Sequence, residues 1–212
     1  MGRPRVLLAD DHTLIVDAFR KLLEQEFEIV GTASDGRALL AAALQLKPDV
    51  VVVDLGLPLL NGIDAGRELK KLMPQTKLLV VTMNEDSGVA AEALRQWASG
   101  YLLKKSAGSE LVHAVRELLR GKSYVTPKVA QQLVNEFIHE PEMHRRKLLS
   151  PRQREVLQLL AEGRTMRETA TILKLTSRTV AFHKYRIMRE FGLRNNSDLL
   201  KLAIREHLVP PV

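Results

Sequence analysis

The sequence predicts an α/β protein in which a five-stranded, doubly wound parallel sheet is followed by a small all-α domain of four helices. Short apolar runs alternate with amphipathic stretches from residue 4 to about residue 120. This alternation is typical of parallel sheets that carry helices on both faces. After Gly121 the strand pattern stops, and only helical patterns follow. An α+β fold, in which some of the runs pair antiparallel, is the alternative.

Five apolar runs are expected as strands, near residues 4–9, 27–32, 49–53, 77–82 and 100–103. The third contains four consecutive valines, a composition typical of a strand that is buried on both faces. Between the runs, apolar residues recur at helical spacing, as in Leu14, Ala18 and Leu22. Ser109 and Gly121 flank the last of these helical segments and favour its two ends.

The second half of the chain is expected to be helical. Residues 126–138 form one helical pattern, with Pro127 at a first-turn position. The polar stretch His139–Lys147 contains a proline and has no apolar period, so it is expected to be a linker. The predicted domains are therefore 1–122, a connecting helix and linker at 123–147, and 148–212.

The composition limits the class of protein. With 212 residues the chain can form two ordinary domains, and 45% hydrophobic with 27% charged residues excludes a disordered or membrane-embedded chain. The sequence has no cysteine, so it has neither disulfides nor thiolate chemistry. The N-terminus lacks the apolar stretch of a signal peptide. Residence in the cytoplasm, without a membrane partner, is the expectation.

The net charge of +7 is unevenly placed. Residues 1–122 hold 16 of the 32 Lys and Arg and 16 of the 25 Asp and Glu, so the second half carries the whole excess. A neutral half followed by a basic half predicts that the second half meets a polyanion. A basic helical domain that is merely solvated is the alternative.

Polar residues follow four of the predicted strands at the point where each strand ends. Asp10 and Asp11 follow the first, Asp54 the third, Thr82 ends the fourth, and Lys104 follows the fifth. Because the carboxyl ends of parallel strands lie on one edge of the sheet, these side chains are expected to converge. Three carboxylates, a hydroxyl and an ammonium together predict a site for a divalent cation and a phosphoryl group.

Magnesium is the expected cofactor, because it prefers oxygen ligands and keeps several waters. Asp11 and Asp54 suit direct ligation, Asp10 suits contact through water, and the Gly56 carbonyl can add another oxygen. The Asp54 carboxylate can then attack an activated phosphoryl group, while the Lys104 ammonium offsets charge on the transferring oxygens.

Residues 4–120 closely resemble the receiver domain of bacterial two-component response regulators, which has a flavodoxin-like fold. The resemblance lies in the acidic pair Asp10–Asp11, in Asp54, and in the 22-residue step from Thr82 to Lys104. It implies that Asp54 accepts a phosphoryl group from a sensor histidine kinase with Mg²⁺, and that Thr82, Tyr101 and Lys104 are the switch and phosphoryl-binding residues. It also implies a phosphoacceptor rather than an enzyme with turnover.

The basic half predicts a helix-turn-helix. Ser150 and Pro151 suit the start of one helix, a second fits Met166–Leu173, and a third runs from about Ser177 to Phe191. The third helix has a basic and aromatic face that suits a DNA major groove. The residues expected at DNA are Arg178, Thr179, Ala181, Phe182, Lys184, Tyr185, Arg186 and Arg189.

Residues 148–209 resemble the LuxR-type helix-turn-helix of the NarL/FixJ response-regulator subfamily. The likeness lies in the segments 149–157 and 179–184. Thr169 departs from the aliphatic residue usual in the family, and Lys174 departs from the frequent glycine, so both are expected to loosen the second helix or its turn. The resemblance implies binding to double-stranded DNA, a homodimer after phosphorylation, and RNA polymerase as a further partner.

Phosphorylation is expected to act as a switch, in which Thr82 moves toward the phosphoryl group and Tyr101 swings inward. The receiver then either releases the recognition helix or dimerises. Two other functions stay open at this point. A haloacid-dehalogenase-like phosphatase also uses a strand-end aspartate, but it needs a second acid where this chain has Gly56. The second open function is a receiver that is not phosphorylated and regulates through protein contacts.

Overall fold

The computed structural model describes residues 2–139 and 149–210, which form two compact units. The first unit contains a parallel sheet with strand order β2-β1-β3-β4-β5-β6. Its strands are β1 (Arg5–Ala9), β2 (Glu28–Ala33), β3 (Val50–Val53), β4 (Lys77–Thr82), β5 (Gly100–Leu103) and β6 (Tyr124–Val125). The four valines of β3 are buried, as expected for a strand in the middle of a sheet with both faces covered.

The doubly wound parallel sheet is confirmed, and the count of five strands is wrong for the described residues. The sixth strand, β6, pairs in parallel with β5 through Gly100↔Tyr124 and Tyr101↔Val125. Two residues are too few to show an alternating pattern, and polar residues flank them. Tertiary pairing with β5, which the local sequence does not encode, therefore decides that this segment is a strand.

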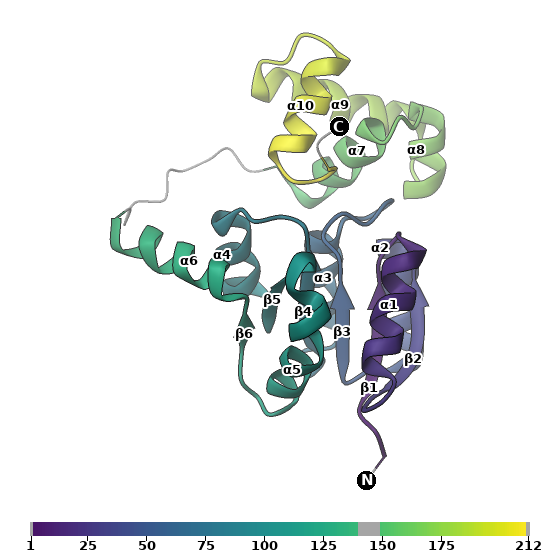
Figure 1. Cartoon of the computed structure of the whole chain (residues 1–212). Coiled ribbons are helices and arrows are strands. Elements are labelled where there is room, and N and C mark those ends of the chain that lie inside the picture. Colours follow the sequence, from purple (N-terminus) through teal and green to yellow (C-terminus); the bar gives the residue numbers. More distant parts are fainter. Residues whose placement is uncertain (1, 140–148, 211–212) are drawn as a thin grey trace. The chain divides into compact units, whose positions relative to one another are not determined.

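Helices cover both faces of the sheet. The helical elements of the first unit are α1 (Thr13–Leu23), α2 (Gly36–Leu46), α3 (Gly62–Leu72), α4 (Ser87–Gln96), the 3₁₀ turn η1 (Lys104–Ser106), α5 (Ala107–Leu119) and α6 (Pro127–His139). Helices α1 and α5 lie on one face, and α2 and α3 lie on the other (Figure 1). Phe19 of α1 and Leu111 of α5 pack with strand residues such as Val52 in one buried core.

Helix α4 is fixed to α3 by a close contact at its C-terminal end. Trp97, the residue that caps α4, is 2% exposed and lies against Gly66 of α3. A Cβ at Gly66 would come within 2.3 Å of the Trp97 ring, so glycine makes room for the indole. Arg67 of α3 also pairs with Glu92 of α4.

Helix α6 packs beside α4 (Figure 1). It matches the helix expected over residues 126–138. The predicted linker His139–Lys147 lies, apart from His139, outside the described residues. No helix in the described parts of the chain is long and apolar enough to cross a bilayer.

The second unit contains four helices over residues 149–210, as the sequence predicts: α7 (Pro151–Ala161), α8 (Met166–Leu173), α9 (Ser177–Phe191) and α10 (Asn196–Arg205). Ser150 begins α7 with a capping box completed by Gln153, and Thr165 begins α8 with one completed by Glu168. Leu157, Ile187 and Leu202, from three different helices, pack together in its core. This core holds α9 in place.

Both expected departures in the second unit leave a physical trace. Lys174 ends α8 in the left-handed region, with φ 54° and ψ 47°, where glycine is the residue without a steric penalty. Thr169 is fully buried, and its hydroxyl has no hydrogen-bond partner among the described residues. Each feature is expected to cost stability.

Candidate functional site

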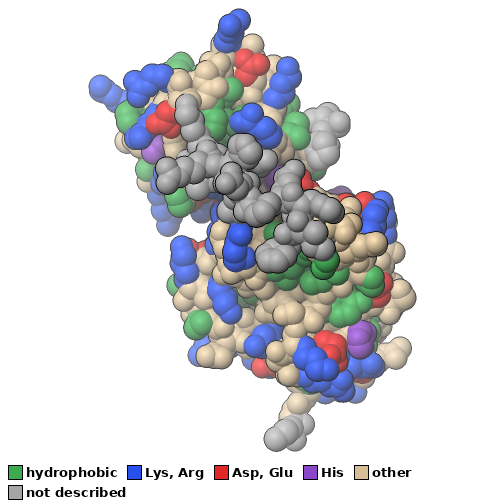
Figure 2. Space-filling model, turned by 90° about the vertical axis from the view of Figure 1, so that its left-hand side faces the viewer, with side chains coloured by type: hydrophobic (Ala, Val, Ile, Leu, Met, Phe, Trp, Pro, Cys, Tyr) green, Lys and Arg blue, Asp and Glu red, His purple; other side chains and the backbone are tan. Residues whose placement is uncertain are grey.

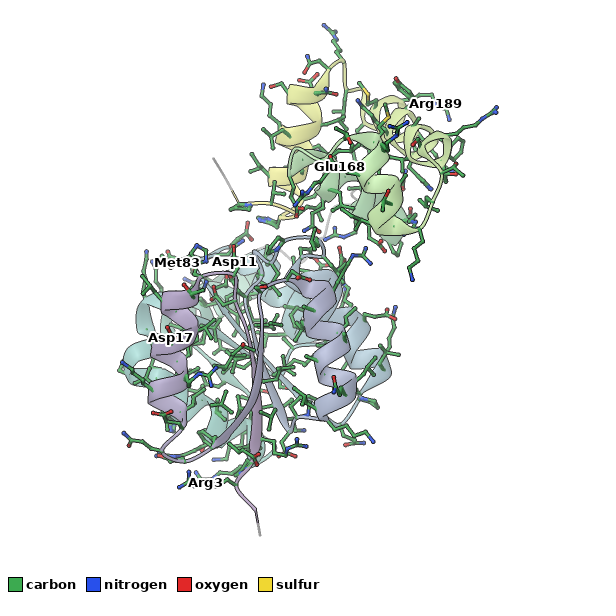
Figure 3. All side chains as sticks on the ribbon, turned by 90° about the vertical axis from the view of Figure 1, so that its right-hand side faces the viewer. Arg3, Asp11, Asp17, Met83, Glu168 and Arg189 are labelled. Carbon is green, nitrogen blue, oxygen red and sulfur yellow. The ribbon has the colours of Figure 1, made fainter. Side chains whose placement is uncertain are left out.

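The parallel strands bring the acidic residues to one edge of the sheet. Val53 pairs with Ala9, and the Asp54 N–H donates to the Ala9 carbonyl at 2.9 Å. Asp10 and Asp54 therefore leave neighbouring strands side by side. Figure 3 shows Asp11 at this edge, with Arg3 at the opposite end of the sheet.

Four side chains form a cluster that can hold a cation. Asp10, Asp11, His12 and Asp54 each offer one ligand atom, and these atoms lie within 4.8 Å of one another. Asp10 and Asp54 are buried, whereas Asp11 and His12 are exposed. Two buried carboxylates with a third at the surface match the oxygen-rich donor set that Mg²⁺ prefers.

Lys104 joins two of these carboxylates. Its Nζ lies 2.7 Å from Asp10 Oδ2 and 2.8 Å from Asp54 Oδ2, and its side chain is 8% exposed. Burial lowers the pKa of Lys104, but the hydrogen bonds to Asp10 and Asp54 outweigh burial and leave the pKa above its usual value. Lys104 therefore stays an ammonium ion at neutral pH and partly neutralises the acidic cluster.

His12 is a member of the cluster that sequence reasoning missed. Its Nδ1 lies 2.8 Å from Asp11 Oδ1 and 3.2 Å from Asp10 Oδ1. The signal was its place directly after the acidic pair. Gly56, expected to lend its carbonyl, lies close by, because a Cβ there would be 3.5 Å from Asp54 Oδ2.

Gly62 packs against the backbone of Asp54. It begins α3, and its N–H donates to the Leu55 carbonyl at 2.9 Å. A Cβ at this position would lie 2.0 Å from the Asp54 carbonyl oxygen and 2.8 Å from the Leu55 Cα. Glycine is therefore required here by the close approach of α3 to the strand end that carries Asp54.

Thr82 and Tyr101 both contact the loop between β4 and α4. The Thr82 hydroxyl accepts from the Asn84 N–H at 3.2 Å, and the Tyr101 hydroxyl donates to the Asn84 carbonyl at 2.8 Å. Tyr101 is fully buried, and burial together with the nearby Asp86 and Asp54 raises its pKa. The ring already points inward, so the expected inward swing is not needed from this conformation.

The second unit presents α9 as its basic helix. Val180 and Ile187 are buried, whereas Phe182 and Tyr185 are 59% and 60% exposed. Arg178, Arg186 and Arg189 are exposed as well, and Thr179, Ala181 and Lys184 are partly buried. On the face shown in Figure 2, Lys and Arg side chains of this unit outnumber acidic ones. Exposed aromatic rings beside basic groups are typical of a surface that contacts a partner.

Arg186 and Thr179, two of the α9 residues expected at DNA, have polar partners within the unit. Arg186 Nε donates to Glu190 Oε1 at 2.7 Å, and Glu190 also accepts from Gln153. The hydroxyls of Thr179 and Thr176 are 2.9 Å apart at the start of the helix. Arg186 is therefore held in an ion pair within the unit, whereas Arg178 and Arg189 lie exposed at the surface.

His183 lies between the two faces of α9. Burial lowers its pKa, and the positive charges of Arg152 and Arg186 lower it further. Its Nδ1 is buried without a hydrogen-bond partner among the described residues. The neutral imidazole is therefore the form that fits this fold.

Comparison with known families assigns both units. Residues 6–116 match the response regulator receiver domain, and residues 147–203 match the LuxR family of bacterial regulatory proteins. The chain is 33% identical over 214 residues to the oxygen regulatory protein NreC of Staphylococcus carnosus (strain TM300), with 97% of this chain and 99% of that protein covered.

Solved structures of another regulator are similar over almost the whole chain. RcsB of Salmonella enterica serovar Typhimurium, bound to the promoter P1flhDC in the presence of phosphomimetic BeF₃⁻, is 30% identical with a TM-score of 0.61. A structure of two RcsB dimers bound to two parallel DNAs is 30% identical with a TM-score of 0.59. Each match covers 94% of this chain and 97% of the other.

Proposed function

Because this chain belongs to the bacterial two-component response regulators of the NarL/FixJ subfamily, with a receiver and a LuxR-type DNA-binding domain, we propose that a sensor histidine kinase phosphorylates it on Asp54. The phosphorylated chain then binds specific double-stranded DNA as a homodimer and regulates transcription in the cytoplasm. The observation that carries the proposal is the Lys104 ammonium, which bonds both Asp10 and Asp54 inside an acidic cluster.

The chemistry of the proposed step follows from the residues. An Asp54 carboxylate oxygen attacks the phosphorus and forms a P–O bond, while the bond to the donor imidazole breaks and the imidazole keeps the electron pair. Lys104 offsets the negative charge that develops on the phosphoryl oxygens. Held by Asp10, Asp11, Asp54 and the Gly56 carbonyl, Mg²⁺ would supply further charge compensation.

The acyl phosphate would change the neighbourhood of the loop between β4 and α4. Phosphorylation adds about 1.5 to 2 negative charges at neutral pH. The Thr82 hydroxyl, which now accepts from Asn84, would turn to donate to a phosphoryl oxygen. Tyr101 would respond through its hydrogen bond to the Asn84 carbonyl. We propose this hydrogen-bond exchange as the switch. Phosphorylation changes the DNA-binding state of this chain, so catalytic turnover is not part of the proposed function.

Recognition of DNA is assigned to α9. Arg178, Lys184, Arg186 and Arg189 are proposed to contact phosphates, which supply affinity and salt dependence rather than sequence choice. Base edges and thymine methyl groups are proposed to meet the exposed face of the helix, formed by Thr179, Ala181, Phe182 and Tyr185. Two-fold DNA sites read by dimers are common for this motif, and RNA polymerase is the proposed partner at the promoter.

The variant Asp54→Asn tests the proposal, with Asp17→Asn as its control because Asp17 is an exposed carboxylate on α1 (Figure 3). Each full-length chain is incubated with Mg²⁺ and acetyl phosphate, and phosphoryl incorporation is measured by intact mass. Binding sites are selected from random duplex DNA with the phosphorylated wild type.

Wild type and D17N should incorporate one phosphoryl group and gain at least about tenfold in DNA affinity, within the range usual for coupled sites. D54N should show neither change. If D54N were phosphorylated as much as the wild type, the phosphoacceptor would be a residue other than Asp54. A wild-type chain that is never phosphorylated would favour regulation by protein contacts alone.

A further inference from the structure

Strand β6 and helix α6 lie beyond the stretch that matches the receiver family, which ends at residue 116. They nevertheless form part of the first unit. β6 extends the sheet beyond β5, and Gly100 allows this close approach, because a Cβ there would lie 2.8 Å from the Tyr124 carbonyl oxygen. The segment is thus packed onto the strand that leads to Lys104.

Thr126, between β6 and α6, makes two hydrogen bonds to β5. Its N–H donates to the Tyr101 carbonyl at 2.9 Å, and its hydroxyl oxygen accepts from the Leu103 N–H at 3.0 Å. The side chain is buried, with 4% of the residue exposed. A threonine just before a helix commonly accepts a hydrogen bond from the first helical turn, but the Thr126 hydroxyl accepts from Leu103 of β5. The residue that follows Leu103 is Lys104, which bonds Asp10 and Asp54.

A second attachment reaches the loop after β4. Lys128, in the first turn of α6, donates to Glu85 Oε2 at 2.5 Å, and Lys105 donates to Glu85 Oε1 at 3.0 Å. Glu85 follows Asn84, whose backbone contacts both Thr82 and Tyr101. The first turn of α6 is therefore tied to the ends of both β4 and β5.

We propose that Thr126 is a positioning residue for phosphoryl transfer to Asp54, acting through the end of β5 that carries Lys104. This proposal rests on the proposed function. The same contacts connect the phosphorylation site to α6. Thr126, just before α6, bonds to β5 next to Lys104, and Lys128 in α6 bonds to Glu85 in the loop after β4. A purely structural role would instead affect stability without any specific effect on the transfer step.

The test uses the full-length chain with Thr126→Val, which keeps the shape of the side chain and removes the acceptor, and Thr126→Ser, which keeps the acceptor. Thr76→Val is the matched control. Thr76 is also buried at 7%, and its hydroxyl donates to the Pro48 carbonyl just before β4 and β3 begin, at the other end of the sheet. Rates of phosphorylation by acetyl phosphate are measured over a range of Mg²⁺ concentrations, with melting temperatures and amide exchange of Leu103 and Lys104.

T126V should lower the maximal rate at least about fivefold and speed exchange of the Leu103 amide about tenfold, since a buried N–H loses its acceptor. The Mg²⁺ concentration at half-maximal rate should change less than twofold, and T126S should restore the rate. T76V should lower the melting temperature but leave the rate unchanged.

Should T126V fail to fold, Thr126→Ala removes the same acceptor with a smaller side chain, and Lys128→Met tests the second attachment at a position whose side chain is 58% exposed. K128M should lower the maximal rate about twofold and speed amide exchange around Glu85, in keeping with an exposed ion pair. A rate within experimental error of wild type for the folded Thr126 variant that lacks the acceptor, or an equal loss for T76V, would overturn the role of Thr126. A wild-type chain that accepts no phosphoryl group would overturn the proposed function itself. A wild-type chain that is phosphorylated, with an unaffected Thr126 variant, would overturn only the role of Thr126.

Discussion

The variant Gly62→Ala offers a sharp test of how tightly the fold holds Asp54. The new Cβ would lie 2.0 Å from the Asp54 carbonyl oxygen, whereas real Cβ atoms essentially never come closer than 3.0 Å. The two groups must therefore separate by about 1 Å, the difference between these distances. A misplacement of about 1 Å can cost about a hundredfold in rate at a reacting centre.

The variant should lose stability but stay folded. Overpacking costs about 1–3 kcal/mol. The gain of about 1 kcal/mol from alanine in place of glycine applies to helix interiors, and Gly62 is the first residue of α3, so little of it is expected here. We therefore expect a loss of about 1–3 kcal/mol in the free energy of unfolding, which is less than the stability of about 5–15 kcal/mol usual for folded proteins.

Phosphorylation by acetyl phosphate with Mg²⁺, followed by urea unfolding, separates the two effects. Gly108→Ala is the matched control, because Gly108 lies in the first turn of α5 and a Cβ there meets nothing within 4 Å. G108A should be as active as wild type and at least as stable. A folded G62A chain with a phosphorylation rate within twofold of wild type would refute the reasoning.

Four further outcomes are expected. Lys104→Met leaves two buried carboxylates facing each other, so it should lower the free energy of unfolding by about 3 kcal/mol without Mg²⁺. Added Mg²⁺ should recover part of this loss in a urea titration. Lys174→Gly removes a left-handed residue that costs about 1–2 kcal/mol, so the melting temperature of the second unit should rise. Lys184→Ala should reduce the salt dependence of DNA binding by about one unit of slope for every sequence tested, whereas a change confined to one base position would contradict a phosphate contact. His183 has a lowered pKa, so the folded state binds fewer protons than the unfolded state. The contribution of His183 to the free energy of unfolding is then fully present above its usual pKa of 6.5 and is lost as the pH falls below that value. The drop in melting temperature between pH 7.5 and pH 5.5 should therefore be smaller for His183→Gln than for the wild type.

The sequence predicts the sheet well because buried parallel strands are continuous apolar runs. The expected strand near 77–82 and the expected helix at Ser177–Phe191 agree with the structure at both ends. The grouping of Asp10, Asp54 and Lys104 was also predictable, since each follows a strand of one parallel sheet. Topology alone brings such residues to a common edge.

What could not be predicted depends on tertiary contacts. Strand β6 exists because Thr126 and its neighbours bond to β5, and no local pattern in two residues encodes that pairing. His12 was overlooked because it does not itself end a strand, and its only signal is its place after the acidic pair. The buried position of Tyr101 could not be read from the sequence either, because a rotamer depends on the cavity around the ring rather than on spacing.

The contact between Trp97 and Gly66 gives the molecule a native optical reporter. Trp97 is the only tryptophan in the chain, and it lies between α3 and α4 of the first unit. Its emission will shift to the red only when that packing opens, so fluorescence melts will record the first unit separately. Circular dichroism, to which the helices of both units contribute, will record the two together. The difference between the two curves will show whether the units unfold as one, without any label or added residue.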